Sequence, residues 1–351
     1  MDDNNLKNVN ENKAEENVVS GNYGECEMVY SVWDNPTNNV ASSLKYTITG
    51  LPLNRAIQNF YIGSDNIYVT QQDGKGNFLI EKCALTGVYL NHMKINNGGH
   101  GSTLEYSHTS LNGDIYFLIS THKYYDSTQD RYYANQLGIV KFEVNEINGI
   151  NSDSIKRIKG IKYANKSLNG FCDEIKSAVA AITTNRNKIL IYARATSKKV
   201  QYSMYNFEEF KSQLSTVPAT FQNNKNLKCE WSCTQENDNI ILPNEDFQGI
   251  DISNQQNGIY KIYIASGNQA KNKSLIIVRI DYNINQNTIN YKSSAKVLLP
   301  AALFAGDSKR EFELEGIHLV NNELYIGVSP AGEGVDKTKA YICYVSASDF
   351  D

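Results

Sequence analysis

The chain has 351 residues, of which 21% are charged, 41% are hydrophobic and only 6 are proline, a composition typical of a folded globular protein and not of a disordered one. Its formal net charge is -4, so we expect no broad basic surface and no nucleic-acid partner. The longest apolar runs, such as residues 275–278, are far too short to cross a bilayer, and we predict no transmembrane segment.

The first residues are rich in Asn and Glu and lack both the basic and the apolar region of a signal peptide. We therefore predict a disordered polar tail at residues 1–20 and a single domain at residues 21–351. No signal peptide is visible in the chain.

Ile or Leu followed by Tyr recurs five times, each time after a short apolar run and a polar turn. The copies are Ile67-Tyr68, Ile115-Tyr116, Ile191-Tyr192, Ile259-Tyr260 and Leu324-Tyr325. A strand–turn–strand unit repeated in this way indicates radial repetition of small sheets. We predict an all-β fold, a five-bladed β-propeller with four-stranded blades.

The first strand of each unit can be aligned at residues 58–62, 102–106, 176–180, 248–252 and 315–319. The second aligned position is always small or polar, and it is Gly at 249 and 316, which predicts close approach of neighbouring blades around the axis. The last unit ends without a fourth strand. We expect the strand at residues 44–49 to pair with residues 339–345 and to close the ring. One helix is predicted at residues 207–214. Residues 126–131 form a polar loop between two Tyr pairs, which we interpret as a long hairpin, the alternative being a surface binding patch.

Several stretches resemble the helveticin J family of large, heat-labile bacteriocins. They are residues 98–105 (GGHGSTLE), 161–167 (IKYANKS), 200–210 and 312–317 (FELEGI), with further likeness at 67–71 and 297–300. The resemblance runs in the same order over roughly residues 40 to 346. It implies a secreted antibacterial protein that is active against related bacteria, and it does not imply a molecular target. The chain departs from the family in being Asn- and Lys-rich and in its segment at residues 171–174.

The strand alignment also gives the candidate site, at one mouth of the central channel. Position 1 of the five strands holds Gln58, Ser102, Lys176, Gln248 and Glu315, and position 4 holds Tyr61, Glu105, Val179, Asp251 and His318. Strand alternation would point these two sets in opposite directions. We predict ligand-binding roles for Gln58, His100, Ser102, Glu105, Lys176, Gln248, Glu315 and His318, with His100 supplied by the Gly-rich loop before the second unit. The same polar ring could instead hold only water, or a hard cation such as Ca²⁺.

No nucleophile elbow, zinc-binding HExxH helix or phosphate-binding loop is present, so no catalytic residue is assigned. No cofactor is expected, Ca²⁺ in the channel being the alternative. We expect a secreted monomer that binds a cell-envelope component or glycan of target bacteria. The alternatives are a metal-dependent hydrolase or lactonase with its site in the channel, and a lectin-like adhesin.

Overall fold

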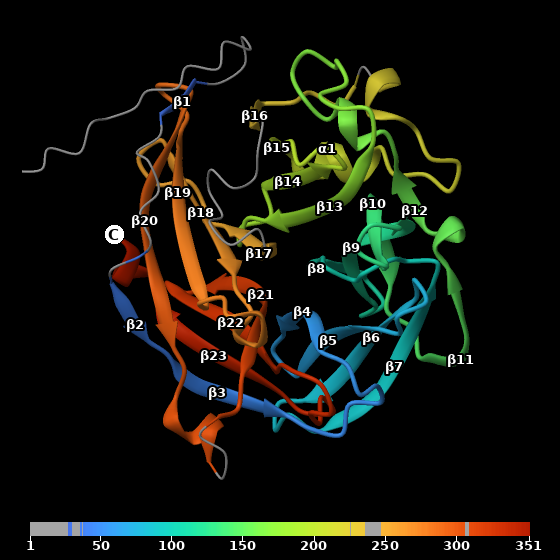
Figure 1. The fold of residues 1–351 in the computed structure, drawn as a ribbon. Helices are drawn as coiled ribbons and strands as arrows, with labels where there is room; N and C mark the ends of the chain where they lie inside the picture. The colour runs from blue at the N-terminus through green and yellow to red at the C-terminus, as the bar shows by residue number, and fades with distance from the viewer. Residues whose placement is uncertain (1–26, 30–35, 37, 225, 236–246, 306–308) are drawn as a thin grey trace, which may run out of the picture.

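The computed structural model describes residues 27–29, 36, 38–224, 226–235, 247–305 and 309–351. The predicted polar tail, residues 1–20, lies outside the described residues. The described part is almost entirely strand, and its sheets are arranged around a central axis as five blades, which confirms the predicted five-bladed β-propeller (Figure 1). No helix of the described residues is long and apolar enough to span a membrane.

The blades follow one another in chain order, and each begins with its innermost strand. The first and second blades contain β4 (Ile57–Ile62), β5 (Asn66–Gln72), β6 (Phe78–Ala84) and β7 (Tyr89–Asn96), then β8 (Leu104–Thr109), β9 (Ile115–Asp126), β10 (Arg131–Lys141) and β12 (Lys156–Ile158). The third and fourth contain β13 (Ile175–Ile182), β14 (Lys188–Ala195), β15 (Val200–Asn206) and β16 (Trp231–Gln235), then β17 (Phe247–Ile252), β18 (Ile259–Ser266), β19 (Ile276–Asn283) and β20 (Thr288–Leu298). The fifth contains β21 (Phe312–Val320), β22 (Glu323–Pro330), β23 (Ala340–Ser346) and β3 (Ser43–Ile48).

The ring is closed by the N-terminal strand β3, as the sequence predicted. It pairs antiparallel with β23, with Ile48 opposite Ala340 and Thr47 opposite Tyr341. The innermost strands β21 and β4 also contact each other, so the last blade packs directly against the first. Segments from both ends of the chain therefore share one sheet.

Three strands that the repeat did not predict extend the outer edges of the blades. They are β11 (Asn145–Asn151), parallel to β7, and β1 (Glu27–Val29) and β2 (Asn39–Ala41), both parallel to β20. Their pairing shields edges that would otherwise expose unpaired backbone groups.

Five hydrophobic clusters, one between each pair of neighbouring blades, form the core. The cluster between the third and fourth blades, for example, packs Tyr192 and Trp231 against Ile264 and Val278. Each sheet is thus apolar on both faces, which explains why a second strand such as β14 contains the continuous apolar run of residues 189–193 and does not alternate.

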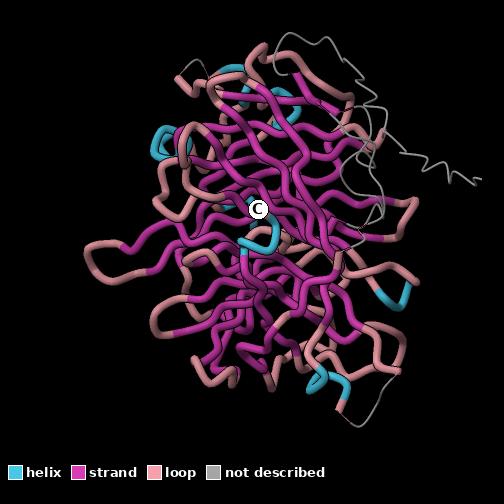
Figure 2. The backbone as a smooth tube through the Cα atoms, turned by 90° about the vertical axis from the view of Figure 1, so that its left-hand side faces the viewer, coloured by secondary structure: helices cyan, strands magenta, loops and turns pink. Residues whose placement is uncertain are grey.

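The short helices lie on connections between strands (Figure 2). Helix α1 (Phe207–Ser212) begins after Asn206, whose side-chain oxygen accepts a hydrogen bond from the Glu209 N–H at 3.0 Å, and it buries Phe207 and Phe210. It ends two residues before the predicted boundary. The 3₁₀ turns are η1 (Ser152–Ser154), η2 (Ile161–Tyr163), η3 (Phe221–Asn223), η5 (Gln269–Lys271), η6 (Ala301–Phe304) and η7 (Ala347–Phe350).

A β-bulge lies at the start of four of the five innermost strands. In β4, Ile57 pairs with Gln71 and Asn59 with Thr70, so Gln58 is the extra residue. Lys176, Gln248 and the Glu315–Gly316 pair occupy the same place in the other three. Because an extra residue reverses the side-chain alternation of a strand, positions 1 and 4 of these four strands need not point in opposite directions.

The two glycines at position 2 meet each other, which confirms the predicted close approach of blades. A Cβ on Gly249 would lie 2.7 Å from the Cα of Gly316. Gly316 has an additional constraint that the sequence did not reveal, a φ of +75°, and a Cβ there would lie 2.8 Å from Asn59 Oδ1.

We expect Gly316→Ala to destabilise the chain more than Gly334→Ala. Gly334 has a similar φ of +70° but no heavy atom within 4 Å of the position that a Cβ would take, so both variants carry the same backbone cost and only Gly316→Ala adds overpacking. The difference in the free energy of unfolding should be about 1–3 kcal/mol, measured by urea denaturation. Equal losses would show that the crowding at Gly316 is unimportant.

A second prediction concerns Glu81, which is fully buried on β6 with no hydrogen-bond partner for either carboxylate oxygen among the described residues. Burial raises the pKa of Glu81 well above its ordinary value of 4.5. The folded chain therefore keeps a proton that the unfolded chain releases, and this stabilising contribution is lost as pH rises above about 4.5, at up to about 1.4 kcal/mol per pH unit.

Glu81→Gln should remove that loss, because the amide stays neutral at every pH. We expect the variant to gain stability over the wild type at pH 8 and to gain less at pH 5, in urea unfolding at both pH values. A difference that does not change with pH would contradict the raised pKa.

Candidate functional site

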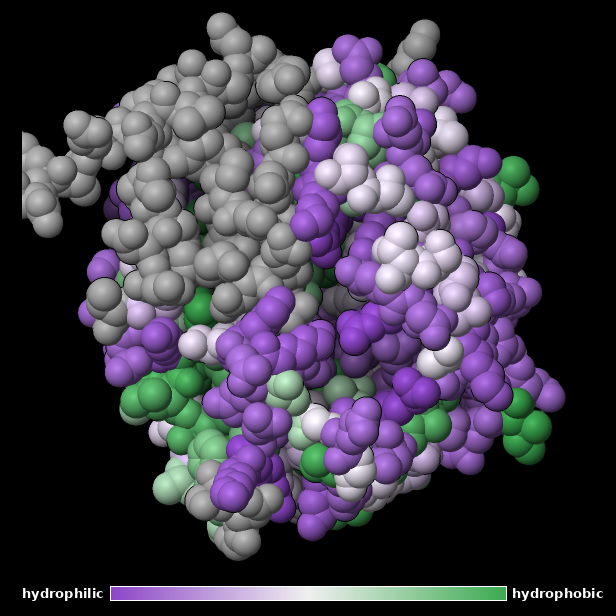
Figure 3. All heavy atoms as spheres, in the orientation of Figure 1, coloured by the Kyte–Doolittle hydropathy of each residue, from purple (hydrophilic) through white to green (hydrophobic). Residues whose placement is uncertain are grey.

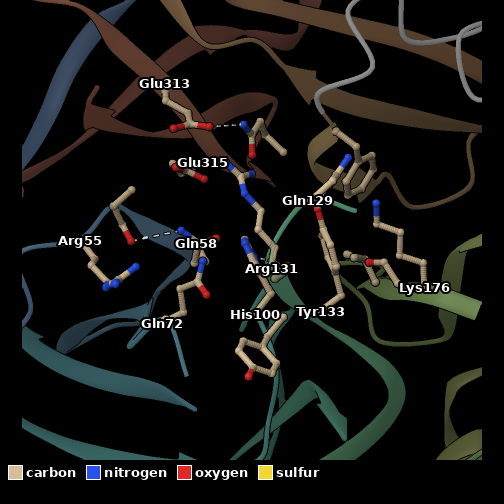
Figure 4. Close-up of a pocket in the computed structure, with 18 of the residues that line it drawn as sticks. Arg55, Gln58, Gln72, His100, Gln129, Arg131, Tyr133, Lys176, Glu313 and Glu315 are labelled. Carbon is tan, nitrogen blue, oxygen red and sulfur yellow. Dashed lines mark hydrogen bonds between the residues drawn. The ribbon is translucent and has the colours of Figure 1, made fainter. Parts of the chain in front are cut away.

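A single cavity of about 810 Å³ brings together all five position-1 residues. Gln58, Ser102, Lys176, Gln248 and Glu315 all line it, although they come from five different blades, and His100 lines it as well. The bulges explain why four of these side chains reach the cavity, because Gln58, Lys176, Gln248 and Glu315 each belong to one. Ser102 lies just before β8, which has no bulge at its start. Their side chains converge on one space from different sides of the ring (Figure 4).

The lining is mainly polar, and basic side chains outnumber acidic ones. Among the described residues that line the cavity, six are basic and three are acidic: Arg55, Arg131, Lys176, Arg194, Lys271 and Lys337 against Asp130, Glu313 and Glu315. This local excess of positive charge contrasts with the net charge of -4 of the whole chain. Hydrophilic residues also predominate around the middle of the face drawn in Figure 3, with hydrophobic ones mostly toward its periphery.

Hydrogen bonds hold several lining side chains in place. The Gln248 amide donates to Glu313 Oε1 at 2.7 Å, and the Gln58 amide donates to the Ile57 carbonyl at 3.0 Å. His100 Nδ1 lies 3.1 Å from the Ser102 hydroxyl oxygen. Burial lowers the pKa of His100 to about 3, with a further contribution from the nearby Arg131, so this imidazole is neutral at neutral pH.

Lys176 is fixed by the most buried ion pair of the cavity wall. Its Nζ lies 2.5 Å from Asp126 Oδ2, and it also lies 4.7 Å from the centre of the Tyr133 ring. Burial alone would raise the pKa of Asp126, but hydrogen bonds from Lys176 and Thr128 lower it to about 2. The pair is therefore ionised across the physiological range.

Glu315 differs from the other acidic lining residues because it is buried. Burial, followed by repulsion from Glu313, raises its pKa well above the ordinary value, against the opposing effect of Lys337 and Arg131. A protonated Glu315 offers the cavity a hydrogen-bond donor and not a negative charge.

Two stacked ring pairs add flat apolar surface to the walls. Tyr192 and Phe247 stack with centroids 4.2 Å apart, and His100 and Tyr133 stack at 5.6 Å. All four residues line the cavity. Aromatic faces beside charged and amide groups are the surface that sugars and other amphipathic ligands stack against.

Glu105 and His318 were predicted to bind ligand at the channel mouth, but neither lines the cavity. They meet Asp251 in a buried cluster formed by β8, β17 and β21, whose possible ligand atoms all lie within 4.8 Å of one another. Burial raises the pKa of Glu105 and of Asp251 and lowers the pKa of His318 to about 4. Of the remaining position-4 residues, Val179 lines the cavity, and Tyr61 stacks on Tyr106 with centroids 5.4 Å apart.

Sequence reasoning missed the lining residues that come from loops. Arg131, Tyr132 and Tyr133 follow the tip of the β9–β10 hairpin, which the sequence did predict as a hairpin but not as part of the site. Arg55 precedes β4 and Lys337 precedes β23. The connection between the second and third strands lines the cavity in several blades, at Gly74, Lys271 and Lys337 for example, but these connections differ in length and sequence, so aligning the first strands gives no signal for them.

A model of the bacteriocin helveticin-J family matches residues 36–344, which is most of the chain. No curated protein matches the chain in a direct comparison.

Among solved structures, the tail fibre of Staphylococcus aureus phage P68 is similar with a TM-score of 0.57 and 17% identity, over 91% of this chain and 55% of that one. The chain thus spans about half the length of that tail fibre. The Podospora anserina α-L-arabinofuranosidase PaAbf62A is similar with a TM-score of 0.47 and 8% identity, over 89% of this chain and 98% of that one. A thermostable family-43 glycoside hydrolase is similar with a TM-score of 0.43 and 11% identity, over 85% of this chain and 91% of that one. At these identities the likeness concerns the fold alone.

The family match covers the closing strand β3, all five blades and every position-1 residue of the cavity. The chain belongs to the bacteriocin helveticin-J family.

Proposed function

We propose that the chain is a secreted, bacteriocin-like protein that binds a component of the cell envelope of target bacteria in the cavity at the channel mouth. The observation that carries the proposal is the convergence of position-1 residues from all five blades on one cavity in a member of a bacteriocin family. Its volume of about 810 Å³ is in the range of cavities that hold small molecules or short segments of a polymer.

The chemistry of the walls favours an anionic glycan as the ligand. Six basic lining residues attract negative charge, and arginine in particular suits phosphate and carboxylate groups. The stacked aromatic pairs provide faces for sugar rings, while Gln58, Gln248 and Glu315 provide hydrogen bonds for hydroxyl groups. Among the described lining residues, the Ser102 hydroxyl oxygen and His100 Nδ1, 3.1 Å apart, are the pair that could act as nucleophile and base, so a hydrolase with its site in the channel remains the alternative function.

The proposal is tested by mixing the purified chain with envelopes isolated from bacteria related to its source. We expect the chain to leave the supernatant with the envelopes, to release no soluble sugar, and to clear a lawn of the same bacteria. Release of envelope fragments would instead support the hydrolase alternative. Adsorption without clearing would support the adhesin, and failure to adsorb to any envelope would contradict the proposed function.

A further inference from the structure

The buried cluster on the axis of the ring is separate from the cavity and has its own chemistry. Glu105, Asp251 and His318 come from the innermost strands of the second, fourth and fifth blades, and all three are at most 7% exposed. His318 Nδ1 lies 3.6 Å from Glu105 Oε1 and 3.8 Å from Asp251 Oδ2. Both separations are longer than a good hydrogen bond, so these groups face one another without bonding directly.

The surrounding hydrogen bonds fix which nitrogen of His318 carries the proton. The Asn59 amide nitrogen donates to the Ser102 carbonyl at 2.8 Å, and Asn59 Oδ1 accepts from the Phe60 N–H at 2.7 Å. Asn59 Oδ1 is therefore an acceptor, and His318 Nε2, 3.2 Å away, must donate to it. In the neutral imidazole this leaves the lone pair of Nδ1 aimed at two carboxyl groups.

Hydrogen bonds from the backbone also orient the Asp251 carboxyl group toward His318. Its Oδ1 accepts from the Ile252 N–H at 2.7 Å, and its Oδ2 accepts from the Leu319 N–H, which adjoins His318 in the chain. A bare imidazole lone pair facing two carboxyl oxygens is a set of three electron donors with no positive partner among them. Three buried groups of this kind repel one another unless protons or a cation lie between them.

We propose that Glu105, Asp251 and His318 bind one divalent first-row transition-metal cation, of the Zn²⁺ or Mn²⁺ kind, on the axis of the propeller. Tetrahedral ligands at about 2.0–2.2 Å from such an ion lie roughly 3.3–3.6 Å from each other. The separations of 3.6 and 3.8 Å between His318 Nδ1 and the two carboxylate oxygens are close to this range. The hydrogen bond from Nε2 to Asn59 is the outer contact that orients a metal-binding imidazole. An imidazole with two carboxylates suits Zn²⁺ or Mn²⁺ better than Ca²⁺, which prefers six to eight oxygen ligands.

Such an ion would link three blades that are distant in the chain, and it does not depend on the function proposed for the cavity. Without a cation, protons shared among the two carboxyl groups and the imidazole would have to relieve the repulsion between these three buried groups. The competing explanation is therefore a proton-sharing cluster that never holds metal.

The test is the metal content of tag-free protein, followed by titration of the chelator-treated chain with Zn²⁺, Mn²⁺ and Ca²⁺ by calorimetry and thermal unfolding. We expect one Zn²⁺ or Mn²⁺ per chain and a rise in Tm with metal. Asp251→Asn should lose the site, and Asn59→Ala, which removes the orienting contact together with the Asn59 hydrogen bonds to Ser102 and Phe60, should weaken it about 10–100-fold. Glu81→Gln, a buried carboxyl outside the cluster, is the matched control and should bind like the wild type.

Absence of one-to-one binding of both transition metals to the wild-type chain would overturn the proposal in favour of proton sharing, and this outcome does not depend on any variant folding. Binding of Ca²⁺ alone would overturn the proposal too. So would wild-type affinity for Zn²⁺ and Mn²⁺ in both the Asp251→Asn and the Asn59→Ala variants.

Discussion

A chain that begins at residue 51 is expected not to fold. The deletion removes β3, the only described partner of the outer edge of β23, and with it Ile48, which is fully buried between the fifth and first blades. The fifth blade would keep three strands and expose an open edge and part of its core. We expect circular dichroism of the 51–351 chain to show no cooperative thermal transition.

Deletion of residues 1–26 is the matched control, because it removes none of the described strands. This shorter deletion should melt like the full chain. If the 51–351 chain also melted like the full chain, β3 would not be what closes the ring.

Breaking the Lys176–Asp126 pair should have the next largest effect. Lys176→Met leaves the Asp126 carboxylate, which is 9% exposed, without its cation, and breaking a buried pair in this way typically costs about 3–5 kcal/mol. Lys188→Met is the control, since the Lys188–Glu230 pair has the same 2.5 Å separation but side chains that are 22% and 36% exposed. An exposed pair contributes about 0–1 kcal/mol.

The pH dependence of the loss has a defined sign. The pKa of Asp126 is depressed to about 2 from an ordinary 3.8, so the contribution of the pair is present above about pH 3.8 and disappears as pH falls toward 2. The stability difference between wild type and Lys176→Met should narrow from pH 7 to pH 3 in urea unfolding. Equal losses for the two Met variants at pH 7 would show that burial does not strengthen the Lys176 pair.

The sequence predicted the features that repeat. Five Ile/Leu-Tyr copies located the blades, the missing fourth strand of the last blade predicted the pairing of β3 with β23, and the aligned strand starts predicted the five residues that line the cavity. Such features recur because every blade packs against its two neighbours around one axis in the same way.

The features that occur once could not be predicted in this way. Arg131 and Tyr133 reach the cavity from the β9–β10 hairpin, whose strands of 12 and 11 residues are longer than the second and third strands of the other blades. Strand β11 pairs with β7 through a segment with no apolar alternation. Glu105, Asp251 and His318 all stand at position 4 of their strands, so the alignment placed them at one level of the channel, but it did not show that they form a cluster apart from the cavity. The bulges that reverse the alternation depend on local backbone geometry and leave only a weak trace in the sequence, a small residue at position 2.

The most direct test of whether the cavity is the binding site is to measure how labelled protein binds to isolated envelopes. The measurement compares the wild type with the Arg131→Glu and Lys292→Glu variants. Arg131 lines the cavity and is exposed, while Lys292 is exposed on β20, the fourth strand of its blade, so both variants change the net charge equally. We predict that Arg131→Glu weakens binding at least about tenfold, or 1.4 kcal/mol, and that Lys292→Glu binds like the wild type. Equal binding by wild type and Arg131→Glu, or equal weakening by both variants, would contradict a binding site at the channel mouth.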